Sequence, residues 1–504
     1  MNKEENIKIK ITDEMLAVPG VHIIDAPTGA GKSHAIGKLT GKVLVVSPRC
    51  VLVDQQTENE FKEHKNITVR TIQSLAYMPN PVEYIIGNSL DFYGRKWDAV
   101  IVDEAHDLLV SSDYDDKCIE LVKIILRAPV LICLTATNIG LEKLFRFLGR
   151  NAIIHKYADN IRKKLCGGTF GYVPDIETAV DVINRKLKKG EKVLFFADKI
   201  SQITKIMRAF LGSKEILPVV AKSNSAYKKL CKERVDEINM LVTNQKFPEG
   251  VSVVCATKVM DVGLNIRDDK VTTVICSMAC LATLRQCMGR KRLDNTKNEK
   301  VDFYCIPPTG QSLAKRKEKI EVELGKYDTY KNYYDIHLQE REGVKLDNQD
   351  IVYYTYRDGK LVEEIDYCKL VYYEYLLETV YKTPTVLEWK RLVEQMLGCQ
   401  GVPMKAVKQQ KTEQWQYEQT MKFLNKLENG LIETKVQKEA FEYIYGDEFK
   451  GPKAFNRLWE ERGWNFHMDG SQEGKATYVT DENGKKKRKR NRDAWRVTRD
   501  MQKE

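Results

Sequence analysis

The sequence lacks three features that would place it in a membrane or outside the cell. No uncharged stretch is longer than the 14 residues of 271–284, whereas a membrane-spanning helix needs about 20. Residues 1–6 are polar and no apolar run follows them, so we expect no secretory signal. The 12 cysteines include no C-x-x-C pair, which argues against a disulfide scaffold or a zinc ribbon. We therefore expect an intracellular, cytoplasmic protein, in the host cytoplasm for a viral source, with the nucleus as the eukaryotic alternative.

The composition also excludes disordered and fibrous chains. Of the 504 residues, 42% are hydrophobic and 30% are charged, and at roughly 150 residues per domain this length predicts about three domains. Lys and Arg exceed Asp and Glu by 11. That surplus favours a polyanionic partner, although solvated surfaces often carry as much charge.

The first 310 residues alternate short apolar runs with helical stretches, which is typical of a parallel α/β sheet. Most of the runs are continuously apolar, as expected for strands that helices cover on both faces. The rhythm restarts after residue 156, so we predict two α/β domains, at residues 1–160 and 161–310. The predicted strands are 21–24, 43–46, 67–70, 99–102 and 130–134 in the first domain, and 193–196, 216–220, 251–255, 272–276 and 301–306 in the second.

Beyond residue 310 we predict a tyrosine-rich, mostly helical accessory region at 311–430. A β-hairpin is expected around Asp358-Gly359, which suits a tight turn, and helices are expected at 367–381, 386–397 and 414–427. Its tyrosines would either stack on bases or pack the hairpin against a helix, the commoner role. The residues in question are Tyr353, Tyr354, Tyr356, Tyr372, Tyr373 and Tyr375.

Residues 431–504 form a predicted basic region that binds nucleic acid. Two short helices, at 434–445 and 452–462, precede strands at 476–480 and 494–497, and a loop between those strands holds six consecutive cations. This order resembles a winged helix whose wing carries the charge. A solvated charge run or a nuclear-import signal is the alternative. The predicted nucleic-acid contacts are Lys485, Lys486, Lys487 and Arg488.

A glycine-rich loop follows the first predicted strand and precedes a predicted helix. It is a P-loop with Ala26 in place of the first glycine. The glycines let backbone N–H groups approach phosphate oxygens, Lys32 would hold the β- and γ-phosphates, and Ser33 would bind Mg²⁺. The residues predicted to bind nucleotide are Pro27, Thr28, Gly29, Ala30, Gly31, Lys32 and Ser33.

Asp103-Glu104-Ala105-His106 follows the predicted strand 99–102. A carboxylate at the carboxyl end of a parallel strand lies where such sheets bind ligands. Asp103 is suited to Mg²⁺, and Glu104 is suited to orient an attacking water. His106 taken alone would more often be a packing or capping residue.

With the P-loop and this motif, the chain resembles the superfamily 2 helicases of the DExH type. The resemblance continues in the family's order as far as Arg292 and implies two tandem RecA-like domains that bind ATP and Mg²⁺. Backbone-contacting motifs imply nucleic-acid contacts at Ser47, Pro48, Arg49, Thr71, Gln73, Ser74 and Thr257. The motif Thr135-Ala136-Thr137 implies that Thr135, Thr137 and His106 couple hydrolysis to the strand. Motif V, at residues 256–265, implies nucleotide contacts from Asp261 and Gly263.

Motif VI departs from the family's spelling. Gln286 and Arg290 stand at the family's positions, but the second arginine, Arg292, comes one residue early. On a regular helix, residues two apart point about 200° apart, so the two arginines would not share a target. Either the helix ends or bends there and both reach ATP, or Arg292 faces nucleic acid or solvent. The shortened spelling resembles the helicases grouped with herpesvirus origin-binding proteins.

The resemblance implies a nucleic-acid-dependent ATPase that moves along or unwinds a strand, with Glu104, Gln286, Arg290 and Arg292 as catalytic residues. DNA is the favoured substrate, in replication and with replication proteins as further partners. The alternatives are an RNA helicase and a replication-origin-binding protein that an auxiliary ATPase assists.

Overall fold

The computed structural model divides the chain into two compact units. Unit 1 comprises Met1–Tyr172, Asp236–Phe247 and Lys258–Pro403, and unit 2 comprises Val173–Val235, Pro248–Thr257 and Met404–Glu504. The residues that the structure describes are 9–26, 30–47, 56–57, 61–71, 74–75, 97–113, 115, 117–157, 168–210, 213–221, 224–257, 265–293, 299–332, 351–357, 360–405, 413–425, 427, 431–432, 435–445, 451–470, 477–480, 486–489 and 495–499.

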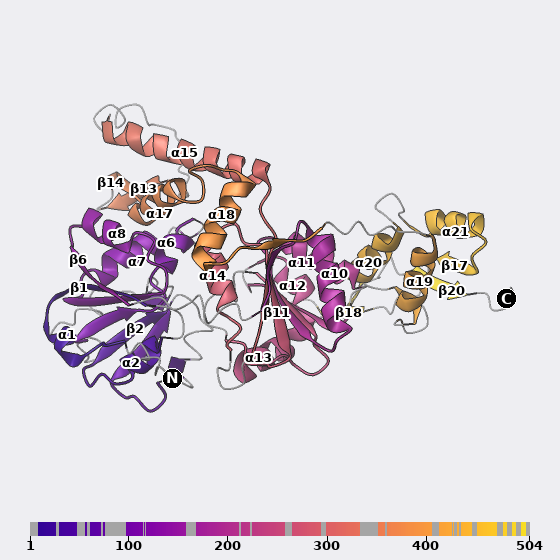
Figure 1. Ribbon diagram of the computed structural model, residues 1–504, viewed down its shortest axis with the longest axis horizontal. Coiled ribbons are helices and arrows are strands. Elements are labelled where there is room, and N and C mark those ends of the chain that lie inside the picture. The colour runs from indigo at the N-terminus through magenta and orange to yellow at the C-terminus, as the bar shows by residue number, and fades with distance from the viewer. Residues whose placement is uncertain are drawn as a thin grey trace. The chain divides into compact units, whose positions relative to one another are not determined.

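The first sheet, in unit 1, is parallel in every pairing and has the order β3-β2-β4-β5-β1-β6. Figure 1 labels its strands β1, β2 and β6. Strand β5 separates β1, which precedes the P-loop, from β4, which precedes Asp103, and this is the RecA-like arrangement predicted from the sequence. The strands are β1 (Gly20–Asp25), β2 (Val43–Ser47), β3 (Ile67–Thr71), β4 (Ala99–Val102), β5 (Val130–Thr135) and β6 (Ala152–Lys156). The helices are α1 (Asp13–Ala17), α2 (Lys32–Ile36), α6 (Asp107–Ser111), α7 (Lys117–Ile125) and α8 (Leu141–Phe147).

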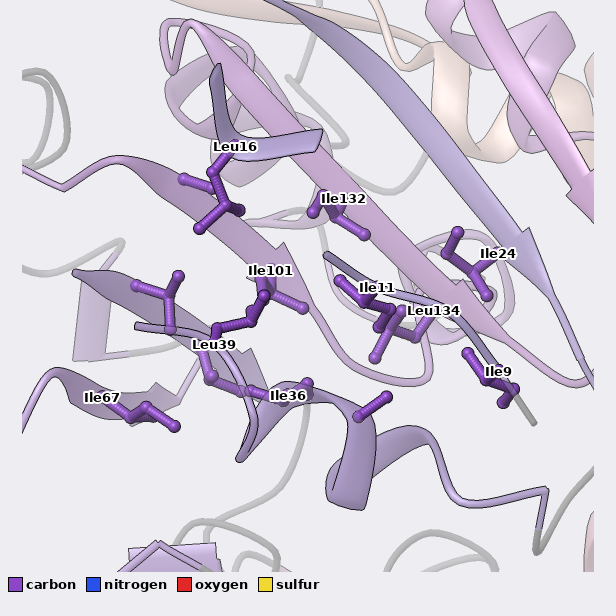
Figure 2. Packing of buried hydrophobic residues seen from close by; sticks show 14 of the residues in the cluster. Ile9, Ile11, Leu16, Ile24, Ile36, Leu39, Ile67, Ile101, Ile132 and Leu134 are labelled. Atoms are coloured by element: carbon purple, nitrogen blue, oxygen red, sulfur yellow. The ribbon is translucent and has the colours of Figure 1, made fainter. Parts of the chain in front are cut away.

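An apolar cluster on one face of this sheet fixes the strands that carry the site. Ile24, Ile101, Ile132 and Leu134 from the sheet meet Ile36 of α2, and all five are fully buried (Figure 2). Burying such a side chain contributes about 1.5–3 kcal/mol. The ends of β1, β4 and β5 are therefore held at one edge of the sheet.

The second parallel set has its strands in both units. In unit 1 the order is β15-β7-β12-β11, and in unit 2 it is β8-β10-β9. These strands are β7 (Phe170–Tyr172), β8 (Lys192–Phe196), β9 (Ile216–Val219), β10 (Val253–Ala256), β11 (Val271–Cys276), β12 (Asp302–Cys305) and β15 (Val402–Pro403). The helices are α10 (Ile176–Leu187), α11 (Ile200–Ala209), α12 (Tyr227–Leu230), η2 (Lys232–Arg234), α13 (Val235–Asn244) and α14 (Leu281–Met288).

The tyrosine-rich region belongs to unit 1 and packs on the first sheet's helices. Helix α17 contacts α6, α7 and α8, and Figure 1 shows it over them. Tyr372 and Tyr373 are buried, so the packing role holds for these two. The side chains of Tyr354 and Tyr356 lie outside the described residues. The elements are α15 (Gly310–Asn332), β13 (Val352–Arg357), β14 (Lys360–Ile365), α17 (Tyr367–Glu378) and α18 (Val386–Leu397).

The C-terminal elements of unit 2 have the topology of a winged helix. Strands β16, β20 and β17 form an antiparallel sheet in that order, and β18 pairs with β19 as the wing. The basic run was predicted to lie in a loop, and for Lys486–Lys489 this is wrong, because these residues form β19. The elements are α19 (Glu413–Leu424), β16 (Leu431–Ile432), α20 (Lys435–Tyr445), α21 (Pro452–Glu461), β17 (Phe466–Asp469), β18 (Thr477–Thr480), β19 and β20 (Trp495–Arg499).

Candidate active site

The P-loop turns at Gly31, where φ is +85°, a backbone conformation that glycine adopts without strain. Lys32 begins α2, and its side chain is only 9% exposed because the ammonium folds back on the loop. Its Nζ donates to the carbonyl oxygen of Ala26 at 3.1 Å. Pro27, Thr28 and Gly29 lie outside the described residues. The Lys32 ammonium therefore points toward the middle of the P-loop.

The Asp-Glu-Ala-His turn is tied to both neighbouring strands. The N–H of Asp103 donates to Val46 of β2, and the N–H of Ala105 donates to Leu134 of β5. Between them Glu104 has φ of +48°, in the left-handed region. A non-glycine residue there costs on the order of 1–3 kcal/mol and persists only where its surroundings enforce it. The hydrogen bonds of Asp103 and Ala105 therefore hold the backbone from which the Glu104 carboxylate projects.

Glu104 is a buried carboxylate among cations. Burial raises its pKa, but the cations Lys32, Arg290 and Arg292 together hold the pKa below the ordinary value. Arg290 Nη2 lies 3.8 Å from Glu104 Oε1, and His106 Nδ1 lies 3.7 Å from Oε2. The carboxylate is therefore ionised at neutral pH and able to accept a proton or a hydrogen bond.

His106 lies in a directed chain of hydrogen bonds. Burial lowers its pKa, so the ring is neutral. The Thr135 hydroxyl donates to the carbonyl of Thr137, and its oxygen is therefore left to accept from His106 Nδ1, 3.1 Å away. His106 Nε2 must then accept, and the Gln286 side-chain amide donates to it. The three residues predicted to couple hydrolysis to the strand are thus joined to Gln286 of motif VI.

The end of α14 explains the short motif VI. The helix stops at Met288, and Lys291 pairs as an isolated parallel bridge with Ile266. Ile266 exchanges backbone hydrogen bonds with Arg290 and Arg292 on either side of the bridge. In extended backbone, residues two apart point to the same side. Both arginines accordingly act on Glu104, while Lys291 makes its own buried ion pair with Glu299 at 3.0 Å.

Arg292 is oriented by a residue that the sequence reasoning did not assign. Its Nε donates to Oδ1 of Asn265 at 2.7 Å. Asn265 is the last residue of the predicted motif V, whose Asp261 and Gly263 lie outside the described residues. The alternative in which Arg292 faces solvent does not fit this bond or the electrostatic effect of Arg292 on Glu104.

Asp103 is held from two sides. Its Oδ1 accepts from the N–H of Glu104 at 3.0 Å, and its Oδ2 accepts from the Gln56 amide at 2.9 Å. The Ser47 hydroxyl donates to Gln56, and Ser47 is fully buried. The side chain of Ser47, predicted to contact nucleic acid, is therefore committed to this cluster and unavailable to a bound strand. Pattern reasoning also missed Gln56.

The remaining predicted nucleic-acid contacts are only partly described. Thr71 accepts from the N–H of Ser74 at 2.9 Å, in a local turn at the end of β3. Thr257 follows β10 in unit 2, and its N–H donates to Val219. Pro48, Arg49, Gln73 and Lys485 lie outside the described residues, as do the side chains of Lys486, Lys487 and Arg488. Their roles remain predictions.

Neither a cluster of metal-binding side chains nor a membrane-spanning helix is found in the described part of the chain. No group of three or more His, Cys, Asp or Glu side chains there is placed to hold a metal ion by itself. None of its helices is long and apolar enough to cross a bilayer. A Mg²⁺ ion held by one carboxylate, a hydroxyl and phosphate oxygens would need no such group.

Comparisons with known proteins gave structural likenesses only. No family description matches the sequence, and no curated protein matches it. Among solved structures, the chain is similar to the Escherichia coli DEAH/RHA helicase HrpB, with 16% identity, a TM-score of 0.37, and coverage of 58% of this chain and 42% of that one. It is similar to S. cerevisiae Dbp5 bound to RNA and ADP BeF3, with 15% identity, a TM-score of 0.41, and coverage of 57% and 79%. It is also similar to the Mycobacterium smegmatis helicase Lhr bound to ssDNA and AMP-PNP, with 17% identity, a TM-score of 0.39, and coverage of 60% and 45%.

Proposed function

We propose that this chain is an ATP-dependent helicase or translocase that acts on DNA. The observation that carries the proposal is the environment of Glu104, an ionised buried carboxylate whose pKa Lys32, Arg290 and Arg292 lower. These three cations act on the single carboxylate of Glu104, so positive charge is in excess around it, beside a P-loop. A polyphosphate is the ligand that such a site stabilises.

The polar atoms that lack partners fit a nucleotide and its water. Within the described residues, Glu104 Oε2 and both Nε and Nη2 of Arg290 are buried without a hydrogen bond. Leaving such atoms unsatisfied costs on the order of 1–3 kcal/mol each, and a γ-phosphate and an attacking water would satisfy them. Ser33 and Asp103 would hold Mg²⁺, which when bound neutralises charge on the β- and γ-phosphates.

The residues then divide the work of hydrolysis. Glu104 accepts a hydrogen bond from water and aims its oxygen at the γ-phosphorus. As the new P–O bond forms and the bond to the β–γ bridging oxygen breaks, Lys32, Arg290 and Arg292 neutralise the charge on the departing oxygens. The bond between His106 and Gln286 joins the Glu104 turn to α14, so a movement of α14 would disturb the site.

The winged-helix topology of the C-terminal elements favours DNA over RNA. Helix-turn-helix modules bind duplex DNA with their second helix in the major groove, and α20 followed by α21 supplies that pair. A wing that carries Lys486–Lys489 adds backbone affinity.

The test compares ATP turnover alone and with single-stranded DNA, duplex DNA or RNA. We expect stimulation by DNA. Stronger stimulation by RNA would favour the RNA helicase, and a footprint on one defined sequence with weak stimulation would favour the origin-binding protein. Glu104→Gln should bind ATP yet hydrolyse it about 100- to 10,000-fold more slowly. Lys32→Ala should lose nucleotide affinity as well.

Glu318→Gln is the matched control, because Glu318 is an exposed carboxylate on α15 in the same unit. It should turn over ATP like the wild type. Turnover by Glu104→Gln within a few fold of this control would remove Glu104 from the mechanism.

A further inference from the structure

Gln56 makes a buried bridge between the end of β2 and the end of β4. It is 1% exposed, and its backbone carbonyl accepts from the N–H of Phe61, itself a core residue. Its side-chain amide contacts Ser47 at 2.6 Å on one side and Asp103 at 2.9 Å on the other. Both the main chain and the side chain of Gln56 are therefore held.

The chemistry of the neighbours fixes which way the amide points. The carboxylate of Asp103 only accepts hydrogen bonds, so the amide nitrogen must face it. The amide oxygen then faces Ser47, whose hydroxyl donates. Flipping the amide would place two acceptors against each other at Asp103, so a single arrangement is favoured.

This arrangement determines the rotation of the Asp103 carboxylate. Gln56 holds Oδ2 while the N–H of Glu104 holds Oδ1, so the plane of the carboxylate is set from both sides. Each carboxylate oxygen has two lone pairs, so it can also accept from a Mg²⁺-bound water.

We propose that Gln56 is a positioning residue that aims Asp103 at Mg²⁺, an inference that rests on the ATPase function proposed above. Gln56 acts through Asp103 and does not touch nucleotide. Groups that orient a metal-binding side chain typically contribute 10- to 100-fold to metal affinity. Ser47, at the other end of the bridge, is the first residue of the segment predicted to contact nucleic acid.

The experiment uses the full-length chain with Gln56→Met and Gln56→Glu. Methionine keeps the volume and loses both hydrogen bonds, and glutamate keeps the shape while placing a carboxylate against Asp103. The affinity for a fluorescent non-hydrolysable ATP analogue is measured in EDTA and in Mg²⁺. We expect both variants to match the wild type in EDTA and to lose about 10- to 100-fold of the affinity that Mg²⁺ adds. Raised Mg²⁺ should restore turnover of Gln56→Met.

Gln416→Met is the matched control. Gln416 is also a buried glutamine with both ends of its amide bonded, to Ile444 and Arg462, but it lies in unit 2. It should lose thermal stability like Gln56→Met and keep the wild-type response to Mg²⁺.

Three outcomes are distinguishable. A wild-type response to Mg²⁺ in Gln56→Met overturns the inference, and if that variant does not fold, a wild-type response in Gln56→Glu does so. An equal loss of affinity in EDTA and in Mg²⁺ also overturns it, because it indicates a general structural role. A wild-type chain that neither binds nor hydrolyses ATP contradicts the proposed function itself.

Discussion

Arg292 depends on Asn265 for its direction. The 2.7 Å bond from Arg292 Nε to Asn265 leaves the other guanidinium nitrogens to point elsewhere, and the pKa of Glu104 responds to that charge. Arginine donors on a planar fork are effective only when the plane is oriented. Asn265 therefore orients the guanidinium that we propose acts on the γ-phosphate.

We predict that Arg292→Ala lowers turnover on the order of 100-fold, as loss of one donor to a transition state does. Asn265→Ala keeps the charge but frees its direction, so it should cost about 10-fold. Single-turnover hydrolysis at saturating ATP measures both. A loss of strand affinity with normal turnover in Arg292→Ala would instead assign Arg292 to nucleic acid.

The contacts of Gln56 and Asn265 could not be predicted from the sequence. The role of Glu104 was predicted because its chemistry is local to one turn, whereas the role of His106 came from the family resemblance. Gln56 and Asn265 act across the fold, on residues 47 and 27 positions away, and no spacing in the chain announces such partners. The direction of Arg292 likewise required a backbone pairing with Ile266 that periodicity does not encode.

The start of α14 is held by the accessory region. The Trp389 indole of α18 donates to the carbonyl of Ala279 at 2.8 Å, and the hydroxyl of Tyr372 lies 3.4 Å from the sulfur of Cys280, the residue that caps α14. Trp389 is fully buried. The helix that carries Gln286 is thereby fixed at its first turn by residues outside the two α/β sets.

We predict that Trp389→Ala costs about 3–5 kcal/mol of unfolding free energy, through the cavity it leaves. Trp389→Phe should cost about 1 kcal/mol, because it fills most of the space and loses one hydrogen bond. Urea unfolding measures both. Leu387 lies on the same helix and is 80% exposed, so Leu387→Ala should change the free energy by less than about 0.5 kcal/mol. Equal costs for Trp389→Ala and Leu387→Ala would disprove this anchoring.

The helices and strands that were predicted best are those whose ends, or whose apolar runs, are marked in the sequence. Helix α18 was predicted at its observed bounds, because Thr385 caps its first turn and Gly398, at φ +67°, ends it. All ten predicted α/β strands are present, since continuous apolar runs mark covered strands. Edge strand β6 was missed because part of it is exposed. The wing strand β19 was missed because four cations do not read as a strand.

The C-terminal winged helix attaches to the second α/β set through α20. Glu439 on that helix pairs with Arg208 at 2.8 Å and Lys229 at 3.4 Å, all within unit 2. Strand β20, near the end of the chain, is the central strand of the three-stranded sheet and contributes the buried Val497. A truncation that removes the basic run and everything after it would therefore destroy the module's core.

Substitution within the wing is the informative test of DNA binding. Replacing Lys486, Lys487, Arg488 and Lys489 with threonine keeps a strand-forming sequence and removes four charges. We predict that the slope of log affinity against log salt on duplex DNA flattens by about 0.9 for each phosphate that the wing ceases to neutralise, hence by up to about 3.6. Threonine at the exposed pair Lys188 and Lys189 is the control for net charge. An unchanged slope would make the run a solubilising or targeting segment.

Because the backbone after α14 is extended, restoring the family's spacing between the two arginines should not bring both of them to the same side. Inserting one residue after Lys291 would restore the three-residue interval that the family uses between its arginines. On a chain that alternates sides, the insertion would turn the second arginine toward the face where Lys291 meets Glu299. We therefore expect the consensus-like insertion to hydrolyse ATP no faster than Arg292→Ala, and wild-type turnover in the insertion variant would argue against the alternation. A sequence alignment that opens a gap here would pair Arg292 with the family's second arginine, although the two would hold different positions relative to the backbone.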